Sequence, residues 1–128
     1  EHGHTVIGLE MVQQAVEAFY GENKLPYDVA KIGKHKKYSN QKVTIYQGDI
    51  FELKSGTIQA DAWYDRAAMI AIEPSTRANY VNQIRKQTKL GAVGLLITFA
   101  YPQEQMEGPP FALHDGDVAM LFSDGFEL

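Results

Sequence analysis

Residues 62–72 read AWYDRAAMIAI, an apolar stretch that two adjacent charges, Asp65 and Arg66, interrupt. A buried strand offers no favourable place for two neighbouring charges. We therefore expect two elements here: a strand over residues 60–65 that ends at its acid, and a segment RAAMIAI that turns away from it. The charged pair then lies at the carboxyl end of a strand, where open α/β sheets bind their ligands.

The segments around this stretch alternate between strand and helix patterns. β-branched or continuous apolar runs predict further strands at residues 4–10 (HTVIGLE), 42–49 (KVTIYQGD) and 92–101 (AVGLLITFAY). The last run is apolar almost throughout, which is typical of a strand buried on both faces. The polar, lysine-rich tract of residues 22–41 lacks such a pattern, and we expect it to be a solvated excursion.

Helical spacing of apolar residues predicts helices over residues 11–21, 73–91 and 114–122. Gly21 is the expected stop of the first helix, Pro74 opens the second, and Asp115 caps the third. The predicted apolar faces comprise Val12, Ala15, Val16 and Phe19; Val81, Ile84 and Thr88; and Val118, Leu121 and Phe122.

Strands that alternate with helices predict an α/β fold with a mostly parallel sheet and helices on both faces. Three predicted strands end in acids, namely Glu10, Asp49 and Asp65. Because the carboxyl ends of parallel strands meet at one edge of the sheet, we expect these acids to border one cleft.

The composition limits the classes of protein to consider. The chain has 128 residues, enough for one domain, and its net charge of −4 argues against wholesale binding to nucleic-acid phosphates. It contains no cysteine, which excludes disulfides and a cysteine nucleophile and fits a reducing compartment. Because no run of about 18 apolar residues occurs, we predict no membrane span.

The first two acids suggest contacts with a nucleotide. An acid that ends a strand of a nucleotide-binding βαβ unit commonly binds ribose hydroxyls, and Glu10 fits that position. The alternative is that Glu10 interacts only with the dipole of the following helix. After the next strand, Asp49 can accept from an exocyclic amine while Ile50 and Phe51 hold a flat base. The alternative there is a plain turn, with Phe51 returning to the core.

The charged pair offers a different chemistry. The guanidinium of Arg66 can bind a planar carboxylate in bidentate fashion, whereas the alternative is a structural ion pair with Asp65. Two histidines without a third ligand make a poor zinc site, so we predict no metal. We expect His2, His4 and His35 to be surface residues. The fourth histidine, His114, should lie near the GPPF segment.

Four motifs occur together in a specific order: GHTVIGLE (3–10), YQGDIF (46–51), WYDRAAMIAI (63–72) and GLLITFAYPQEQMEGPPF (94–111). Together they resemble the thiopurine S-methyltransferase family, especially its bacterial members. The resemblance covers nearly the whole chain. The motifs YDRAAMIAI and GPPF are distinctive, whereas GD and GLE are common.

This resemblance implies a Rossmann-like class I methyltransferase, one domain over residues 1–128, that uses S-adenosylmethionine and a small-molecule acceptor. It implies an S-methyltransferase acting on a small thiol or thiopurine-like compound, cytoplasmic, without a metal, and serving detoxification of xenobiotics. Arg66 would be the catalytic residue and would also contact both cofactor and acceptor. The remaining cofactor residues would be Glu10, Met11, Asp49, Ile50, Phe51 and Asp65. The acceptor residues would be Arg66, Tyr101, Pro110 and Phe111.

The family's first strand, with its glycine-bearing loop, should precede Glu1, and its last strands should follow residue 128. We therefore expect this chain to be a fragment of a longer one, with an incomplete sheet. The full-length protein would be a monomer, and a truncated sheet could associate through its edges. Nucleic acid and membrane are not expected as partners.

Two alternatives stay open. Distant relatives in the same fold methylate tellurite, selenium compounds, sulfide or halide, so the acceptor could belong to those classes. A third interpretation, of another class, is a truncated non-catalytic domain that binds a nucleotide or a partner chain.

Overall fold

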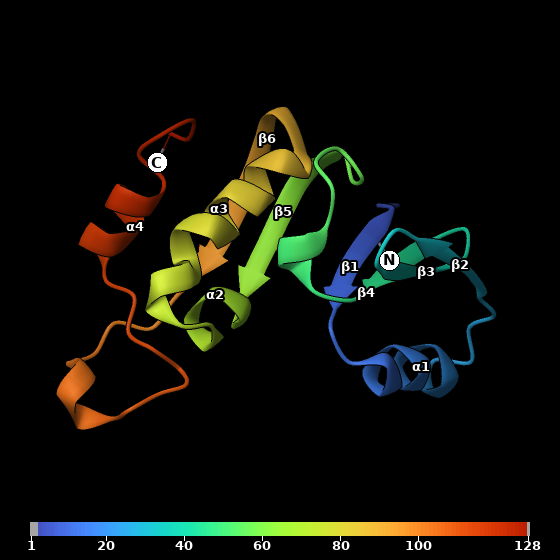
Figure 1. The fold of residues 1–128 in the computed structure, drawn as a ribbon, viewed down its shortest axis with the longest axis horizontal. Coiled ribbons are helices and arrows are strands. Elements are labelled where there is room, and N and C mark those ends of the chain that lie inside the picture. The colour runs from blue at the N-terminus through green and yellow to red at the C-terminus, as the bar shows by residue number, and fades with distance from the viewer. Residues whose placement is uncertain (1–2, 128) are drawn as a thin grey trace. The chain divides into compact units, whose positions relative to one another are not determined.

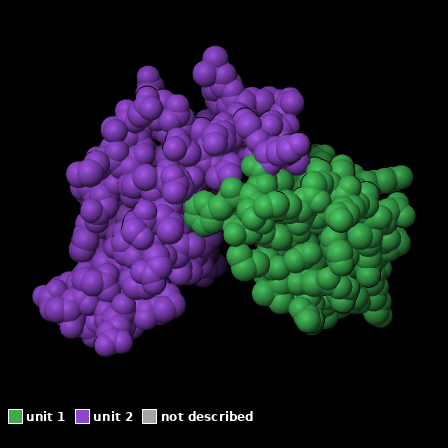
Figure 2. Space-filling view, in the orientation of Figure 1, with its two compact units in different colours: residues 1–53 green, residues 54–128 purple. Residues whose placement is uncertain are grey.

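A computed structural model describes residues 3–127. The chain divides into two compact units, Glu1–Leu53 and Lys54–Leu128, which Figure 2 shows in different colours. Each unit contains its own sheet and its own helices (Figure 1).

The first unit is a four-stranded sheet in the order β1-β4-β3-β2, with one helix packed on it (Figure 1). The candidate site lies where the edge strand β1 pairs in parallel with the inner strand β4. Its elements are β1 (Val6–Glu10), α1 (Gln13–Glu22), β2 (Asp28–Ile32), β3 (His35–Ser39), β4 (Val43–Gln47) and the 3-10 turn η1 (Ile50–Glu52). β1 and β4 run parallel, with Glu10 opposite Gln47, and the other two pairs are antiparallel.

The prediction that residues 22–41 form a solvated excursion is wrong, because most of this tract is the antiparallel hairpin β2-β3. A two-residue turn joins the strands, and Gly33 adopts a φ of 58° there, which glycine tolerates without steric penalty. The tyrosines at the two ends of the hairpin hold it to the helix. The ring centroids of Tyr27 and Tyr38 lie 5.5 Å apart, and that of Tyr20 from α1 lies 4.9 Å from Tyr27.

Helix α1 is confirmed, but its buried face is rotated from the predicted one. Val16 and Tyr20 are buried in the core with Tyr38, whereas Phe19 remains partly exposed. The hydroxyl of Tyr20 donates to the carbonyl oxygens of Tyr38 and Val43, at 3.0 and 3.1 Å, which fixes the rotation of the helix. The helix also continues past Gly21 to Glu22.

The second unit contains a parallel two-stranded sheet (Figure 1). Some of its helices lie in the chain between the two strands, and the others follow the second strand. Its elements are β5 (Ala60–Arg66), α2 (Ala68–Ala71), η2 (Pro74–Thr76), α3 (Arg77–Lys86), β6 (Thr88–Ile97), η3 (Gln103–Gln105) and α4 (Asp115–Leu121). The ring of Trp63 on β5 stacks on Phe122, the residue after α4, with centroids 5.8 Å apart, so the end of α4 is held against β5.

Three details of this unit differ from prediction. Helix α3 ends at Lys86, and Thr88 starts β6 instead of completing a helical face. Strand β6 is not buried on both faces: Val93 is 72% exposed, because β5 is its only neighbour in this sheet among residues 3–127. The residue that precedes α4 as its N-cap is His114, and Asp115 is the first helical residue.

The α/β class is confirmed, whereas the expected mostly parallel sheet is not. The larger sheet is mixed, since β3 pairs antiparallel with both β2 and β4. The Rossmann-like arrangement as a whole stays a prediction. Between residues 3 and 127, no helix has the length and apolar character needed to cross a membrane.

Candidate functional site

The first unit brings together two of the predicted acids. β1 and β4 are neighbouring parallel strands, so Glu10, at the end of β1, and Asp49, just after β4, lie at the same edge of the sheet. The amide of Gly48 donates to the carbonyl oxygen of Glu10 at 2.9 Å, and the Gln47 side chain donates to that of Met11 at 2.7 Å. Two strand ends that are distant in sequence are thereby tied into one surface.

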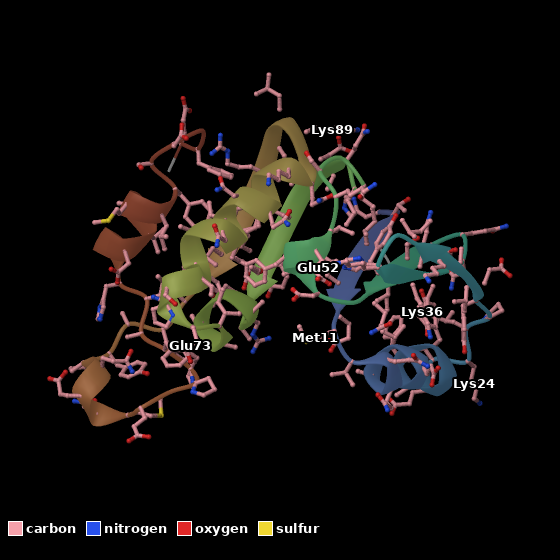
Figure 3. All side chains as sticks on the ribbon, viewed as in Figure 1. Met11, Lys24, Lys36, Glu52, Glu73 and Lys89 are labelled. Carbon is pink, nitrogen blue, oxygen red and sulfur yellow. The ribbon has the colours of Figure 1, made fainter. Side chains whose placement is uncertain are left out.

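Glu10 has one carboxylate oxygen engaged and one available. Its Oε1 accepts the Val12 amide at 3.2 Å, at the start of α1, which is the dipole interaction expected as the alternative. Its Oε2 accepts no hydrogen bond from residues 3–127, and the side chain is half-buried. A half-buried carboxylate oxygen at a sheet edge can accept from a ligand hydroxyl. The next residue, Met11, lies in the turn between β1 and α1 and is largely exposed (Figure 3).

Asp49 likewise has one carboxylate oxygen bonded and one available. Its Oδ1 accepts the amide of Phe51 at 2.9 Å and caps the 3-10 turn η1, while Oδ2 accepts nothing from the described residues. Ile50 is half-buried and Phe51 is about one-third exposed, with 36% of its surface accessible, so Phe51 does not return fully to the core. This turn therefore presents a carboxylate oxygen beside two apolar side chains.

His35 was expected at the surface, and that prediction is wrong. Only 2% of its surface is exposed, and its Nε2 donates to the carbonyl oxygen of Asp49 at 2.7 Å. The imidazole lies directly against Gly48, whose φ is 145°, and a Cβ on Gly48 would come within 2.6 Å of the ring. His35 thus holds the turn that carries Asp49, and the glycine makes room for it.

In the second unit, β5 runs one residue beyond its predicted end, to Arg66, and Asp65 next to that end is buried with both carboxylate oxygens bonded. It is 4% exposed. Its Oδ1 accepts the amides of Ala68 and Met69 at 3.2 and 3.3 Å, and its Oδ2 accepts the Tyr80 hydroxyl from α3 in a short hydrogen bond. Burial, and then the hydrogen bond to Asp65, raise the pKa of the Tyr80 hydroxyl well above the ordinary tyrosine value. The Tyr80 hydroxyl therefore keeps its proton and donates a hydrogen bond to the Asp65 side chain.

The side chain of Arg66 is exposed. Its guanidinium makes no hydrogen bond or ion pair with any residue from 3 to 127, so the structural pair with Asp65 that we considered as an alternative does not form. The following residue, Ala67, adopts a φ of 109°, which an L residue with a Cβ rarely occupies. The chain reverses at this point and enters α2.

The segment of residues 101–111 is built around hydrogen bonds that the sequence did not predict. The Tyr101 hydroxyl donates to the Pro110 carbonyl oxygen in a short hydrogen bond, and Gln103 bridges to the Ala112 amide at 2.8 Å. The Phe111 amide donates to the Ile70 carbonyl oxygen at 2.7 Å. That bond ties the predicted acceptor segment to the helix that follows Arg66.

Two polar residues that support the second unit have no counterpart in the sequence prediction. Arg77 is buried, and its Nη2 donates to the carbonyl oxygens of Phe111 and Ala112 at 3.3 and 3.1 Å. Tyr80, as described above, binds Asp65. Arg77 begins α3 and Tyr80 lies within it. The only sign of these supporting roles in the sequence is an arginine directly after a turn that begins with proline.

The structure thus brings together Glu10, Met11, Asp49, Ile50 and Phe51 in one unit. In the other unit it bonds α2, the helix that follows Asp65 and Arg66, to the segment that contains Tyr101, Pro110 and Phe111. The single cleft predicted to contain all three acids involves both units, and it stays a prediction. His4 and His114 are exposed, and His2 lies outside the described residues.

The family model described as thiopurine S-methyltransferase matches residues 1–128. The thiopurine S-methyltransferase of Shewanella sp. (strain MR-4) is 46% identical over 129 aligned residues, which include 100% of this chain and 59% of that protein. Those of Shewanella sp. (strain MR-7) and Shewanella pealeana (strain ATCC 700345 / ANG-SQ1) are 45% and 42% identical, with the same coverage. The chain therefore spans about three fifths of the length of these curated relatives.

Proposed function

Because this chain belongs to the thiopurine S-methyltransferase family, we propose that the protein carrying it is an S-adenosylmethionine-dependent S-methyltransferase that acts on a small thiol or thiopurine-like acceptor. The observation that supports this most directly is the pair of strand ends in the first unit. Glu10 is the last residue of β1 and Asp49 lies two residues after the neighbouring parallel strand β4, and one carboxylate oxygen of each accepts no hydrogen bond from residues 3–127.

These residues fit the polar and apolar parts of the adenosyl group. The open oxygen of Glu10 accepts from the ribose hydroxyls, and that of Asp49 accepts from the exocyclic amine of adenine. The half-buried Ile50 and the partly exposed Phe51, next to Asp49, cover the faces of the base. Met11 continues the same surface through its exposed side chain. The buried imidazole of His35 holds this turn from behind.

Arg66 is the residue proposed to act on the acceptor. Its cation is accessible, and no carboxylate among residues 3–127 neutralises it. A positioned guanidinium stabilises a thiolate, keeps it ionised and orients its sulfur. The bound cofactor supplies an activated methyl group on a sulfonium centre, so the chain need provide neither a metal nor a nucleophile of its own. A thiol acceptor releases its proton to solvent.

The acceptor contacts are proposed to come from the segment that Tyr101 and Pro110 close on itself. It presents Phe111, half-buried, next to α2. An aromatic residue bonded through its backbone to the helix that follows Arg66 suits a flat acceptor such as an aromatic thiolate. Asp65 is proposed to support this site without contacting a ligand, since both of its oxygens are already bonded.

We further propose that the two units are parts of one methyltransferase domain, that its arrangement is Rossmann-like, and that the enzyme works in the cytoplasm as a monomer. The detoxification of xenobiotic thiols is the proposed role.

The test uses the complete protein that carries these residues. Calorimetry should detect S-adenosylmethionine binding, and a panel of a thiopurine, thiophenol, tellurite and iodide should show methyl transfer to the two thiols. If neither heat nor transfer to any acceptor occurs, the proposed function is wrong. Transfer to tellurite or iodide alone would move the acceptor to another class.

Arg66→Ala tests the role of the cation. We expect turnover to fall about 100-fold, the size of effect seen when one positioned electrostatic group is removed from a site. The melting temperature should not change, because the guanidinium makes no bond within residues 3–127. Arg85→Ala is the matched control, since Arg85 is a partly exposed arginine paired with Asp124 on the surface. Unchanged turnover in Arg66→Ala would remove Arg66 from the mechanism.

A further inference from the structure

Tyr80 and Asp65 form a buried, hydrogen-bonded pair, and Asp65 directly precedes the residue proposed to act on the acceptor. The carboxylate at the end of β5 has no cation as partner among the described residues. Three hydrogen bonds compensate its burial instead, two from the amides of Ala68 and Met69 and one from the Tyr80 hydroxyl. A buried carboxylate is tolerated only when its oxygens are satisfied in this way, so the three donors fix its position.

The fixed carboxylate controls the backbone on either side of Arg66. Asp65 precedes Arg66, and the two amides that bind Asp65 begin α2, immediately after Ala67. Ala67 is held at a φ of 109°, a conformation that persists only where the surroundings impose it. The Arg66 backbone therefore lies within a closed turn, while its guanidinium makes no hydrogen bond or ion pair with residues 3–127.

Asp65 and the two amides that bind it lie within five residues of one another, whereas Tyr80 belongs to α3 and is 15 residues from Asp65 in the sequence. Its hydroxyl donates to the second oxygen of the carboxylate. Without its hydroxyl, Asp65 keeps the local bonds to α2 but loses the bond that ties the turn to the body of the unit.

We propose that Tyr80 is a positioning residue for methyl transfer: by anchoring Asp65, it fixes the strained turn from which Arg66 reaches the acceptor. This inference rests on the proposed function. It assigns to Tyr80 no contact with the cofactor or the acceptor. Its effect on the reaction passes through the orientation of Arg66, and misalignment of a group by about 1 Å is enough to lower a rate strongly.

The test is Tyr80→Phe in the complete protein, which removes one oxygen atom and retains the ring. We expect kcat with a thiol acceptor to fall about tenfold while the KM for S-adenosylmethionine stays unchanged. Hydrogen exchange at the Ala68 and Met69 amides should accelerate, because the carboxylate that accepts from them is no longer held. Tyr20→Phe is the matched control: its hydroxyl is also buried and bonded, but to the carbonyl oxygens of Tyr38 and Val43 in the first unit.

A double-mutant cycle separates positioning from a general effect on stability. In an Arg66→Ala background, Tyr80→Phe should lower kcat no further, because the group that it positions is gone. Independent, multiplying losses in the double variant, an equal loss of kcat in Tyr20→Phe, or unchanged kcat in Tyr80→Phe each overturn the inference. A wild-type protein that binds no cofactor and transfers no methyl group overturns the proposed function as well, so the two failures are distinguishable.

Discussion

Ala67→Gly should make the protein more stable, which is unusual for a substitution that introduces glycine. Ala67 has a φ of 109° and is one of two non-glycine residues with positive φ within residues 3–127; Lys24 is the other. Its Cβ is the source of the steric penalty, and glycine lacks that atom. The residue also lies in the closed turn described above, where its conformation is imposed by the bonds of Asp65.

The size of the gain follows from two opposing terms. Relief of an unfavourable positive φ contributes about 1–2 kcal/mol to the free energy of unfolding. The greater conformational freedom of glycine in the unfolded chain removes about 0.4–1 kcal/mol. The net stabilisation is about 0.5–1 kcal/mol. With a urea m-value of about 2 kcal/mol per molar, the midpoint of unfolding should rise by about 0.3–0.5 M.

Urea denaturation of the complete protein, followed by far-UV circular dichroism, measures this shift. Ala78→Gly is the matched control, because Ala78 is exposed in the first turn of α3, where glycine should lower stability by up to about 1 kcal/mol. If Ala67→Gly lowers the midpoint as Ala78→Gly does, the turn is not strained and the argument that Asp65 imposes its conformation fails.

Two further predictions concern the supports of the site. Gly48→Ala should destabilise the protein by about 1–3 kcal/mol in the same denaturation assay, because the new Cβ meets the buried His35 ring at a positive φ; Gly21→Ala, in α1 with no neighbour within 4 Å of the added atom, should stabilise it instead. The folded state should lose stability as the pH rises above about 10, where tyrosines of the unfolded chain release their protons while Tyr80, with its raised pKa, retains its own. The slope of stability against pH in that range should be shallower in Tyr80→Phe, and an unchanged slope would contradict the assignment.

The elements with strong local patterns could be predicted from the sequence. Strands β1, β4 and β5 were found because alternating or β-branched residues mark a partly buried strand wherever it lies in the fold. The acids that follow these strands were identified for the same reason, since a charge after an apolar run marks the end of the strand. This level of inference needs no knowledge of which strands are neighbours.

The remaining features depend on contacts between distant segments. The hairpin β2-β3 was missed because its lysines dominate the composition, while the residues that hold it, Tyr27 and Tyr38, acquire their partners only when α1 packs against them. His35 was placed at the surface because a histidine among lysines has no local sign of burial. The exposed face of β6 was missed because burial on two faces depends on neighbouring strands, which an apolar run does not specify.

The two aspartates at the strand ends show why position alone does not define a ligand-binding residue. Asp49 and Asp65 use the same local device, in which Oδ1 caps a short helical turn directly after a strand. Each is also held by one aromatic residue distant in sequence, since His35 binds the carbonyl oxygen of Asp49 and Tyr80 binds the carboxylate of Asp65. The difference lies in the atom that is held. Because His35 engages the backbone, Oδ2 of Asp49 stays available to a ligand donor, whereas Tyr80 consumes the same oxygen of Asp65. An acid near a strand end therefore keeps an oxygen that a ligand donor can reach in the first case and has both oxygens bonded within the chain in the second, and this difference is the basis for proposing Asp49 as a binding group and Asp65 as a support.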